Sequence, residues 1–197
     1  MSARLFLARH GLAAYETGLA SDDGGSLRQE GRAQARALGH RLRTEGVTGV
    51  WSSPLSRAVQ TAEIAAGTLG VGVTVREGLR EYGVGSLAGT AGSEAEVIVP
   101  VFERWEDGDD RATIPGGEPV AAIVARTTAV LDEVADRHEG TAALVVGHGG
   151  AVMVSVPVLV GRPRASARDL LLDGGGHVEL VRDGTVWSVV AEHLRPS

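Results

Sequence analysis

Short apolar runs alternate with longer amphipathic segments along this chain. The runs at 4–8, 47–51 and 142–146 are apolar almost throughout, which is typical of strands buried on both faces, and residues 71–75 alternate like a further strand. The longer segments repeat apolar residues every three or four positions, the period of a helix with one buried face. We expect these helices at 27–45, 54–69 and 120–138. The alternation predicts a three-layer α/β fold with a mostly parallel central sheet flanked by helices.

Turn and cap signals refine these boundaries. Gly46 closes the first predicted helix. Ser53 followed by Pro54 suits the N-cap and the first position of the second helix. Asp183-Gly184 is a typical hairpin turn, and the apolar runs on either side of it predict a C-terminal β-hairpin at 178–182 and 186–190.

The remaining segment, 80–117, is rich in Gly, Asp and Glu. We expect a helical excursion with loops there, placed as a cap over the functional site. At 197 residues the chain is long enough to bury one hydrophobic core, and 1–197 is predicted to form a single domain.

Composition and charge exclude several classes of protein. Hydrophobic residues make up 43% and charged residues 22%, as in an ordinary globular protein, and cysteine is absent, so disulfides and thiolate chemistry are excluded. The first residues lack a signal-peptide pattern, and the apolar stretch 151–160 contains Pro157 and is too short to span a bilayer. We therefore expect a cytoplasmic protein. A net charge of -6 disfavours nucleic-acid binding, although positive groups that converge at one place can still bind an anion.

Two of the predicted strands each end in His-Gly, at His10 and at His148. The carboxyl ends of parallel strands lie at one edge of a sheet, so these histidines are expected to face one another. Arg9 precedes His10, and Arg57 lies in the first turn of the helix after the second strand. A helix N-terminus with an arginine fork attracts anions, so the four cations predict a phosphate site. Taken alone, these residues do not name a reaction.

A metal site and the other four histidines are weaker functional candidates than the phosphate site. Two converging histidines could bind a metal, but the neighbouring arginines repel cations, and no His-x-His or Asp-x-His spacing at His10 or His148 supplies further ligands. We expect no metal. His40, His138 and His193 lie among charged neighbours and are expected to be solvated, and His177 is expected to border a turn.

Five motifs in order resemble the histidine phosphatase superfamily, the phosphoglycerate mutase-like family, in its phosphatase branch. Arg9-His10-Gly11 follows the first strand, and LRQEGRAQA is similar to the family's Leu-Thr-x-x-Gly-x-x-Gln-Ala segment. The other three are SSPLSRAVQTA at 52–62, PGGE at 115–118 and GHGG at 147–150. Motifs in this order over essentially the whole chain are far more specific than one of them alone.

The resemblance implies a phosphomonoester hydrolase that uses no cofactor and acts on a small phosphorylated metabolite. His10 is implied as the nucleophile that forms a phosphohistidine. Arg9, Arg57 and His148 are implied as phosphate ligands and catalytic stabilisers of the transition state, with Gly149 beside them in the phosphate site. Nucleophilic attack also requires one nitrogen of His10 to be unprotonated, so the other is expected to donate to a fixed acceptor.

An acidic residue just after the third strand is implied as the proton donor to the leaving group. Glu81 is the candidate, in the segment Leu79-Arg80-Glu81-Tyr82, and Glu77 is the fallback.

Four departures from the family pattern weaken any transfer of substrate identity. Leu12-Ala13 follows the first motif in place of Glu-Thr, and Leu87-Ala88 replaces Trp-Glu in an aromatic turn. Arg28 stands at the Thr position of the Leu-Thr segment, and Met153 stands where an arginine is common. Phosphoglycerate mutase and a non-catalytic phospholigand-binding module stay open as alternatives. The substrate is undetermined, and the edge of the C-terminal hairpin offers a surface for a homodimer.

Overall fold

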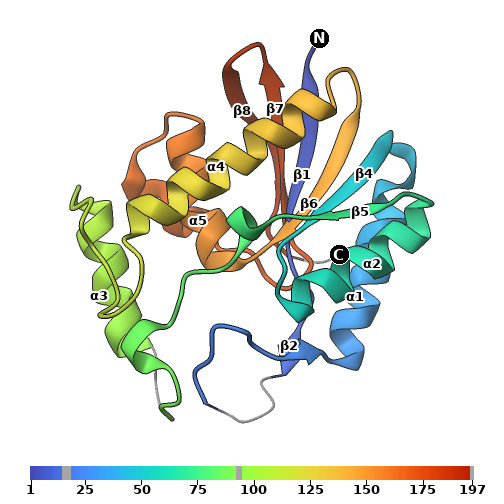
Figure 1. Ribbon diagram of the computed structural model, residues 1–197. Coiled ribbons are helices and arrows are strands. Elements are labelled where there is room, and N and C mark those ends of the chain that lie inside the picture. Colours follow the sequence, from blue (N-terminus) through green and yellow to red (C-terminus); the bar gives the residue numbers. More distant parts are fainter. Residues whose placement is uncertain (15–18, 92–94, 196–197) are drawn as a thin grey trace.

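The computed structural model describes residues 1–14, 19–91 and 95–195, and its centre is a six-stranded sheet (Figure 1). The strand order is β5-β4-β6-β1-β7-β8, in which β5, β4, β6 and β1 pair in parallel and β7 and β8 are antiparallel. The strands are β1 (Ala3–Arg9), β4 (Val47–Ser52), β5 (Val73–Val75), β6 (Ala142–Gly147), β7 (His177–Asp183) and β8 (Val186–His193). This sheet confirms the predicted α/β fold with a mostly parallel sheet and a C-terminal hairpin.

Helices cover both faces of the sheet, which gives the three predicted layers (Figure 1). Successive side chains of β1 point to opposite faces. Leu5 and Leu7 pack with the helices α4 (Val120–Arg137) and α5 (Gly149–Leu159). Phe6 and Ala8 pack with α1 (Gln29–Arg41) and α2 (Ser56–Leu69) on the other face. Because β1 is buried from both sides, the residue that follows it is held by the core.

The second helix begins later than predicted. Leu55, not Ser53, is the N-cap of α2, and Pro54 lies before the helix. The Ser53 hydroxyl is buried and lies 2.7 Å from Nε2 of His148. It also accepts a hydrogen bond from the Leu55 N–H at 3.3 Å. This tertiary contact with the residue that follows β6 replaces the helix cap that the local sequence predicts.

The segment 80–117 contains a helix, α3 (Ala95–Glu106), and the short 3-10 turn η3 (Gly85–Leu87). Ile98, Phe102 and Trp105 of α3 pack against the start of α4 and against the side chains of Met153 and Val154 in α5. Met153, at the position where the family often has an arginine, is therefore part of an apolar cluster. That this segment caps the site stays a prediction.

The remaining elements are short. They are β2 (Ala13–Ala14) paired with β3 (Ser26–Leu27), and the 3-10 turns η1 (Leu42–Thr44), η2 (Glu77–Leu79) and η4 (Arg164–Leu170). The hairpin turn between β7 and β8 has Gly184 at φ +60°, a backbone conformation that favours glycine. Among the described residues, no helix has the length and apolar content needed to cross a bilayer.

Candidate active site

The register of the parallel strands places the two strand-end histidines side by side. Arg9 of β1 lies opposite Gly147 of β6, so His10 and His148 are the next residues on neighbouring strands. Their ring centroids are 5.1 Å apart at an angle of 61°. Both rings are buried.

The protonation of His10 follows from its contacts. Its Nδ1 lies 2.7 Å from the Gly11 carbonyl oxygen, which can only accept, so Nδ1 carries the proton. Nε2 then presents a lone pair, and it accepts a hydrogen bond from Nε of Arg57 at 3.1 Å. Burial lowers the pKa of His10 to about 3, opposed by the Gly11 hydrogen bond and reinforced by the charges of Arg57 and Arg9. His10 is therefore neutral near pH 7, and its Nε2 carries no proton but accepts the Arg57 hydrogen bond.

The charges of two arginines, Arg57 and Arg9, act on this ring. Arg57, in the first turn of α2, is buried and also donates from Nη1 to the Asp23 carbonyl at 3.1 Å. Gly24 has φ +59°, and a Cβ built there would lie 1.7 Å from Arg57 Nη1, so the loop fits against the guanidinium only as glycine. Arg9 donates from Nη1 to the Leu172 carbonyl at 2.7 Å.

His148 has a ring nitrogen that no described group satisfies. Its Nε2 pairs with Ser53 Oγ, whereas its Nδ1 is buried without a hydrogen-bond partner among the described residues. Burial, with the neighbouring charges, lowers the pKa of His148 well below its usual value, so the ring is neutral. If Ser53 donates to Nε2, Nδ1 bears the hydrogen. A buried donor without a partner costs about 1–3 kcal/mol, and an anion bound beside His10 would satisfy it.

The Glu81 carboxylate lies at the N-terminus of α5, the helix that follows His148. Its Oε2 accepts from the Gly150 N–H at 3.0 Å, and its Oε1 accepts from Ala151 at 2.8 Å and Tyr82 at 3.1 Å. Loss of solvation raises the pKa of Glu81, although these amide hydrogen bonds oppose the rise. Oε2 has a single amide partner among the described groups, so a proton can be carried on this oxygen.

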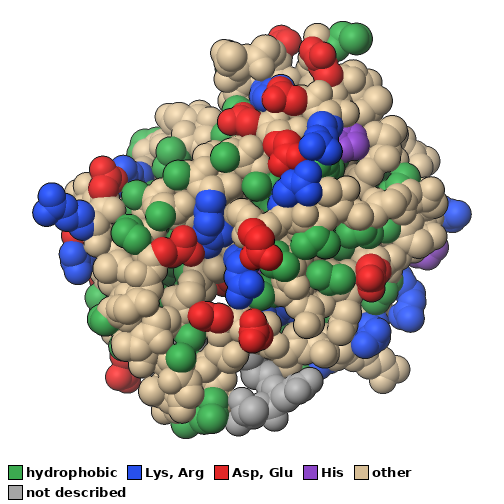
Figure 2. Space-filling view, viewed as in Figure 1, with side chains coloured by type: hydrophobic (Ala, Val, Ile, Leu, Met, Phe, Trp, Pro, Cys, Tyr) green, Lys and Arg blue, Asp and Glu red, His purple; other side chains and the backbone are tan. Residues whose placement is uncertain are grey.

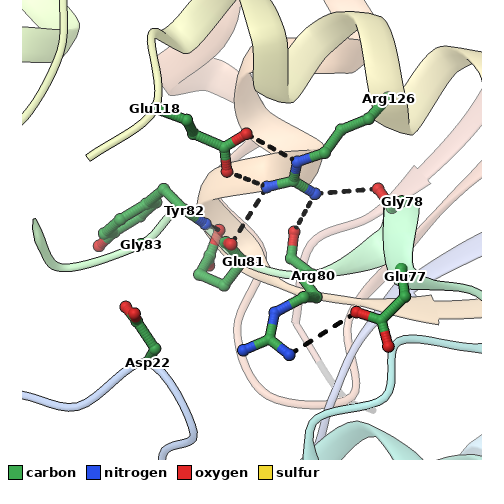
Figure 3. Close-up of a pocket in the computed structure, with 9 residues that line it drawn as sticks. All are labelled: Asp22, Glu77, Gly78, Arg80, Glu81, Tyr82, Gly83, Glu118 and Arg126. Atoms are coloured by element: carbon green, nitrogen blue, oxygen red, sulfur yellow. Dashed lines mark hydrogen bonds and ion pairs between the residues drawn. The ribbon is translucent and has the colours of Figure 1, made fainter.

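A small cavity of about 110 Å³ joins these groups, and its size suits a phosphoryl group. Its lining residues are Arg9, His10, Ser21, Asp22, Arg57, Glu81, Tyr82 and Val84. A second cavity of about 440 Å³ shares Asp22, Glu81 and Tyr82 with the first (Figure 3). Glu77 lines only the larger cavity, where it lies 3.7 Å from Arg80. The structure thus brings Glu81, and not the fallback Glu77, to the cavity that contains His10.

Gly149 lies at the side of Arg9 and begins α5. A Cβ at this position would lie 3.4 Å from Arg9 Nε, an ordinary van der Waals distance. Among the predicted phosphate-site residues, Arg9 and His10 line the small cavity. His148 lies against His10, and Gly149 lies against Arg9.

Sequence reasoning did not single out Ser21, Asp22 and Val84, which line the small cavity, or Arg126 on α4, which lines the larger one. The Arg126 guanidinium donates to the backbone carbonyls of Gly78, Arg80 and Glu81 and pairs with Glu118 of the PGGE motif (Figure 3). The helical period could have placed Arg126 on the edge of the buried face of α4. It could not have shown which carbonyls the side chain meets, because they come from a loop far away in sequence.

The other histidines differ in part from expectation. The prediction that His138 is solvated is wrong, because its Nε2 accepts from Trp51 Nε1 at 3.0 Å and its Nδ1 lies 2.9 Å from Thr48 Oγ1. His177 does follow a turn, but its ring is buried and stacks on that of His193. His40 and His193 are exposed, as predicted.

Charges over the rest of the visible surface are mixed. Figure 2 shows basic and acidic side chains interspersed on the face covered by α4, where Arg126 pairs with Glu118 and Arg137 with Glu133. Over residues 1–14, 19–91 and 95–195, no three His, Asp or Glu side chains are grouped so as to hold a metal ion.

A mostly parallel sheet with His10, His148, Arg9 and Arg57 together at one edge defines an α/β protein with an arginine-lined pocket beside two histidines. The family model of the histidine phosphatase superfamily, branch 1, matches residues 5–193. The chain belongs to this superfamily, which confirms the resemblance drawn from the motifs.

Individual relatives carry different names. "Probable phosphoglycerate mutase GpmB" of Yersinia enterocolitica is 31% identical over 175 residues, which cover 86% of this chain and 80% of that protein. A mycobacterial glucosyl-3-phosphoglycerate phosphatase shares the fold with a TM-score of 0.77 at 24% identity, over 98% of this chain and 99% of that one. A mutant phosphoserine phosphatase from Entamoeba histolytica, solved in complex with phosphoserine, gives a TM-score of 0.79 at 20% identity, over 97% of this chain and 96% of that one.

Proposed function

We propose that this protein is a phosphomonoester hydrolase that acts through a phosphohistidine on His10. The observation that carries the proposal is the hydrogen bond from His10 Nδ1 to the Gly11 carbonyl, which leaves the Nε2 electron pair directed to the cavity side occupied by Arg57. A neutral, oriented imidazole with two arginines beside it is the arrangement that nucleophilic attack on a phosphate dianion requires.

In the first step, the Nε2 electron pair of His10 attacks phosphorus while the bond from phosphorus to the ester oxygen breaks. Arg9, Arg57 and the Nδ1–H of His148 would donate to the phosphoryl oxygens and stabilise the charge that spreads over them. The Arg57 Nε–H that now occupies Nε2 must turn to a phosphoryl oxygen before attack. Phosphate binding would therefore release the nucleophile.

Glu81 would give its proton to the departing ester oxygen. In the second step, the Glu81 carboxylate takes a proton from water, the water oxygen attacks phosphorus, and the bond from phosphorus to nitrogen breaks. The electron pair returns to Nε2, and Glu81 is protonated again. The raised pKa of the Glu81 carboxyl supports both roles, because a carboxyl that alternates between acid and base works best with a pKa near the operating pH.

The position of Glu81 also indicates where the rest of the substrate lies. The ester oxygen must be within reach of this carboxyl, so the alcohol part would occupy the cavity of about 440 Å³ that Glu81 lines. This volume suits a small phosphorylated metabolite, and the charged side chains in its lining suit a hydroxylated one. A different cavity of about 300 Å³ borders His10 on the side of Leu12 and Gly174, away from the acid.

Phosphoglycerate mutase activity is the second candidate, favoured by the name of relatives that are 30–31% identical. A mutase must hold the carboxylate of a triose with cations near the phosphate site. In the larger cavity Arg126 is engaged by Glu118 and by three carbonyls, and Arg80 lies between Glu77 and Asp23. These neighbouring acceptors favour hydrolysis over retention of an acidic triose.

Rapid-quench trapping of a phosphoenzyme tests the proposal. Wild-type protein mixed with radiolabelled p-nitrophenyl phosphate should release nitrophenol and give a phosphoprotein that is stable to base and labile to acid. His10→Ala should give neither, whereas His40→Ala, a change of an exposed histidine on α1, should behave like wild type. Turnover by His10→Ala at a tenth of the wild-type rate would reject the mechanism, and interconversion of phosphoglycerates without phosphate release would select the mutase.

A further inference from the structure

The main chain that carries Glu81 is held by the side chain of Arg126 on α4 (Figure 3). Nη1 donates to the carbonyls of Gly78 at 2.9 Å and Arg80 at 2.6 Å, and Nη2 donates to the carbonyl of Glu81 at 3.1 Å. Arg80 and Glu81 belong to no helix or strand, and Gly78 lies in the short 3-10 turn η2, so these carbonyls lack the partners that a longer helix or a strand provides. Arg126 takes the place of those partners.

Glu118 fixes the orientation of that guanidinium. Its Oε2 accepts from Arg126 Nε at 3.0 Å and its Oε1 accepts from Nη2 at 2.7 Å, the fork geometry that a carboxylate forms with arginine. All three guanidinium nitrogens are thereby engaged. A lysine could not reproduce this arrangement, because one ammonium group cannot serve the carboxylate and three carbonyls in one plane.

Glu81 is consequently anchored at both of its ends. Its carbonyl is bound by Arg126 from α4, and its carboxylate accepts from the Gly150 and Ala151 amides at the start of α5. The two helices pack in one layer on the same face of the sheet. The position of the carboxyl relative to His10 is therefore set by two helices, although Glu81 itself lies in irregular chain.

A role in fold stability alone would not explain all the contacts of the Arg126–Glu118 ion pair. A partly exposed pair between Arg and Glu adds little to the stability of a fold, and the Arg126 and Glu118 side chains are 22% and 32% exposed. Arg126 makes three hydrogen bonds to carbonyls besides this ion pair, and all three lie in the segment that leads to Glu81. Displacement of a catalytic group by about 1 Å can cost about 10²-fold in rate.

We propose that Arg126, oriented by Glu118, is a positioning residue that holds the Glu81 carboxyl where it can protonate the leaving group. The inference rests on the proposed hydrolase function and assigns these two residues a part in it. Loss of the Arg126 side chain should slow transfer from esters whose leaving group needs the Glu81 proton. Transfer from esters whose leaving group departs unaided should be spared.

The test compares two esters by rapid quench, an alkyl phosphate whose alcohol must be protonated and p-nitrophenyl phosphate, whose phenolate leaves unaided. Arg126→Ala should slow phosphorylation of His10 by the alkyl ester by roughly 10–100-fold, part of the ~10²–10⁴-fold that a general acid supplies. The same variant should slow phosphorylation by the nitrophenyl ester less than threefold, about the precision of such comparisons. Added guanidinium should restore part of the alkyl rate.

Further variants separate positioning from stability. Arg137→Ala removes an arginine of the same helix that pairs with Glu133 away from the cavity, and it should leave both rates unchanged. Arg126→Lys and Glu118→Gln should show the same selective loss in smaller measure, and they decide the matter if Arg126→Ala does not fold. Equal slowing of both esters, or no slowing, in folded variants would overturn the inference. Inactivity of the wild-type protein towards both esters would reject the proposed function itself.

Discussion

The Nε–H of Arg57 donates to Nε2 of His10 across 3.1 Å, so the electron pair proposed to attack phosphorus is occupied by a guanidinium hydrogen. Both side chains are buried, and the positive charge of Arg57 helps keep the imidazole in its neutral form. A phosphate dianion attracts the guanidinium more strongly than a neutral imidazole does. Arg57 would thus protect the nucleophile in the absence of substrate and bind the phosphoryl group in its presence.

Arg57→Ala should lower kcat/KM by about 10²–10³-fold, the usual effect of removing one donor to a developing charge. Vanadate, which imitates the five-coordinate phosphorus, should lose more affinity than the substrate does, because the arginine binds best when charge is redistributed. Vanadate inhibition constants and KM values of both proteins check this. Equal losses would restrict Arg57 to ground-state binding.

Glu81→Gln keeps the shape of the side chain and removes its proton. We expect phosphorylation of His10 by alkyl phosphates to slow by about 10²–10⁴-fold and phosphorylation by p-nitrophenyl phosphate to slow much less. Since water activation is also lost, the nitrophenyl ester should give a burst followed by slow turnover. Rapid-quench traces with both esters provide the measurement, and a similar slowing with each would remove Glu81 from the role and make Glu77 the next residue to change.

Gly150→Ala tests how closely α5 fits the acid. A Cβ at this position would lie 2.8 Å from Glu81 Oε1 and 2.5 Å from Tyr82 Cε1, so the methyl group must displace both side chains. Alkyl phosphate turnover should fall by roughly 10–100-fold through misplacement of the carboxyl. Gly67→Ala is the control, because nothing lies within 4 Å of its Cβ in α2 and the change should raise helix stability by about 0.5–1 kcal/mol. Unchanged kinetics in Gly150→Ala would contradict the geometry.

His177 should make the fold sensitive to acid. Burial, with the charges of His193 and Arg41, lowers its pKa to about 4 from an ordinary value of 6.5. Between these values the unfolded chain binds a proton that the folded protein does not, so the free energy of unfolding falls as pH drops from 6.5 to about 4. His177→Gln should reduce this fall by about 1–3 kcal/mol. Urea unfolding across this pH range measures it, with His40→Gln, a change of an exposed histidine, as the control.

Removal of metals should leave activity intact. The proposed phosphate ligands are arginines and histidines, so their donors supply the charge neutralisation for which other phosphatases use cations. Phosphate release after exhaustive EDTA treatment should equal that of untreated protein. Restoration of a lost activity by zinc or magnesium would contradict the proposal.

Most of the fold was predictable because it is encoded locally. The apolar runs that became β1, β4 and β6 need no partner to be recognised, and the Asp183-Gly184 turn marks the hairpin by itself. The placement of His10 and His148 also follows from sequence, since any parallel sheet brings the ends of its strands to one edge. Membership of the superfamily follows from motifs in order.

Details that depend on distant contacts were not predictable. Ser53 looked like a helix cap, but its hydroxyl meets His148, 95 residues away. His138 looked solvated until the fold placed it against Trp51 of β4. The positions of Arg126 and Glu118 relative to Glu81 also depend on contacts between residues that are distant in sequence. No local pattern distinguishes an arginine that faces water from one that meets three carbonyls of a loop.

The sequence by itself therefore determined the strands of the main sheet, the helices α1, α2 and α4, and the edge at which the histidines and arginines gather, because period and strand direction are properties of short segments. It did not predict α5, which follows His148. Tertiary structure alone decided the tautomer of His10, the anchoring of Glu81 between α4 and α5, and the hydrogen bond from Arg57 to the nucleophile. Each of these depends on distances of about 3 Å between polar atoms that only the packed core fixes.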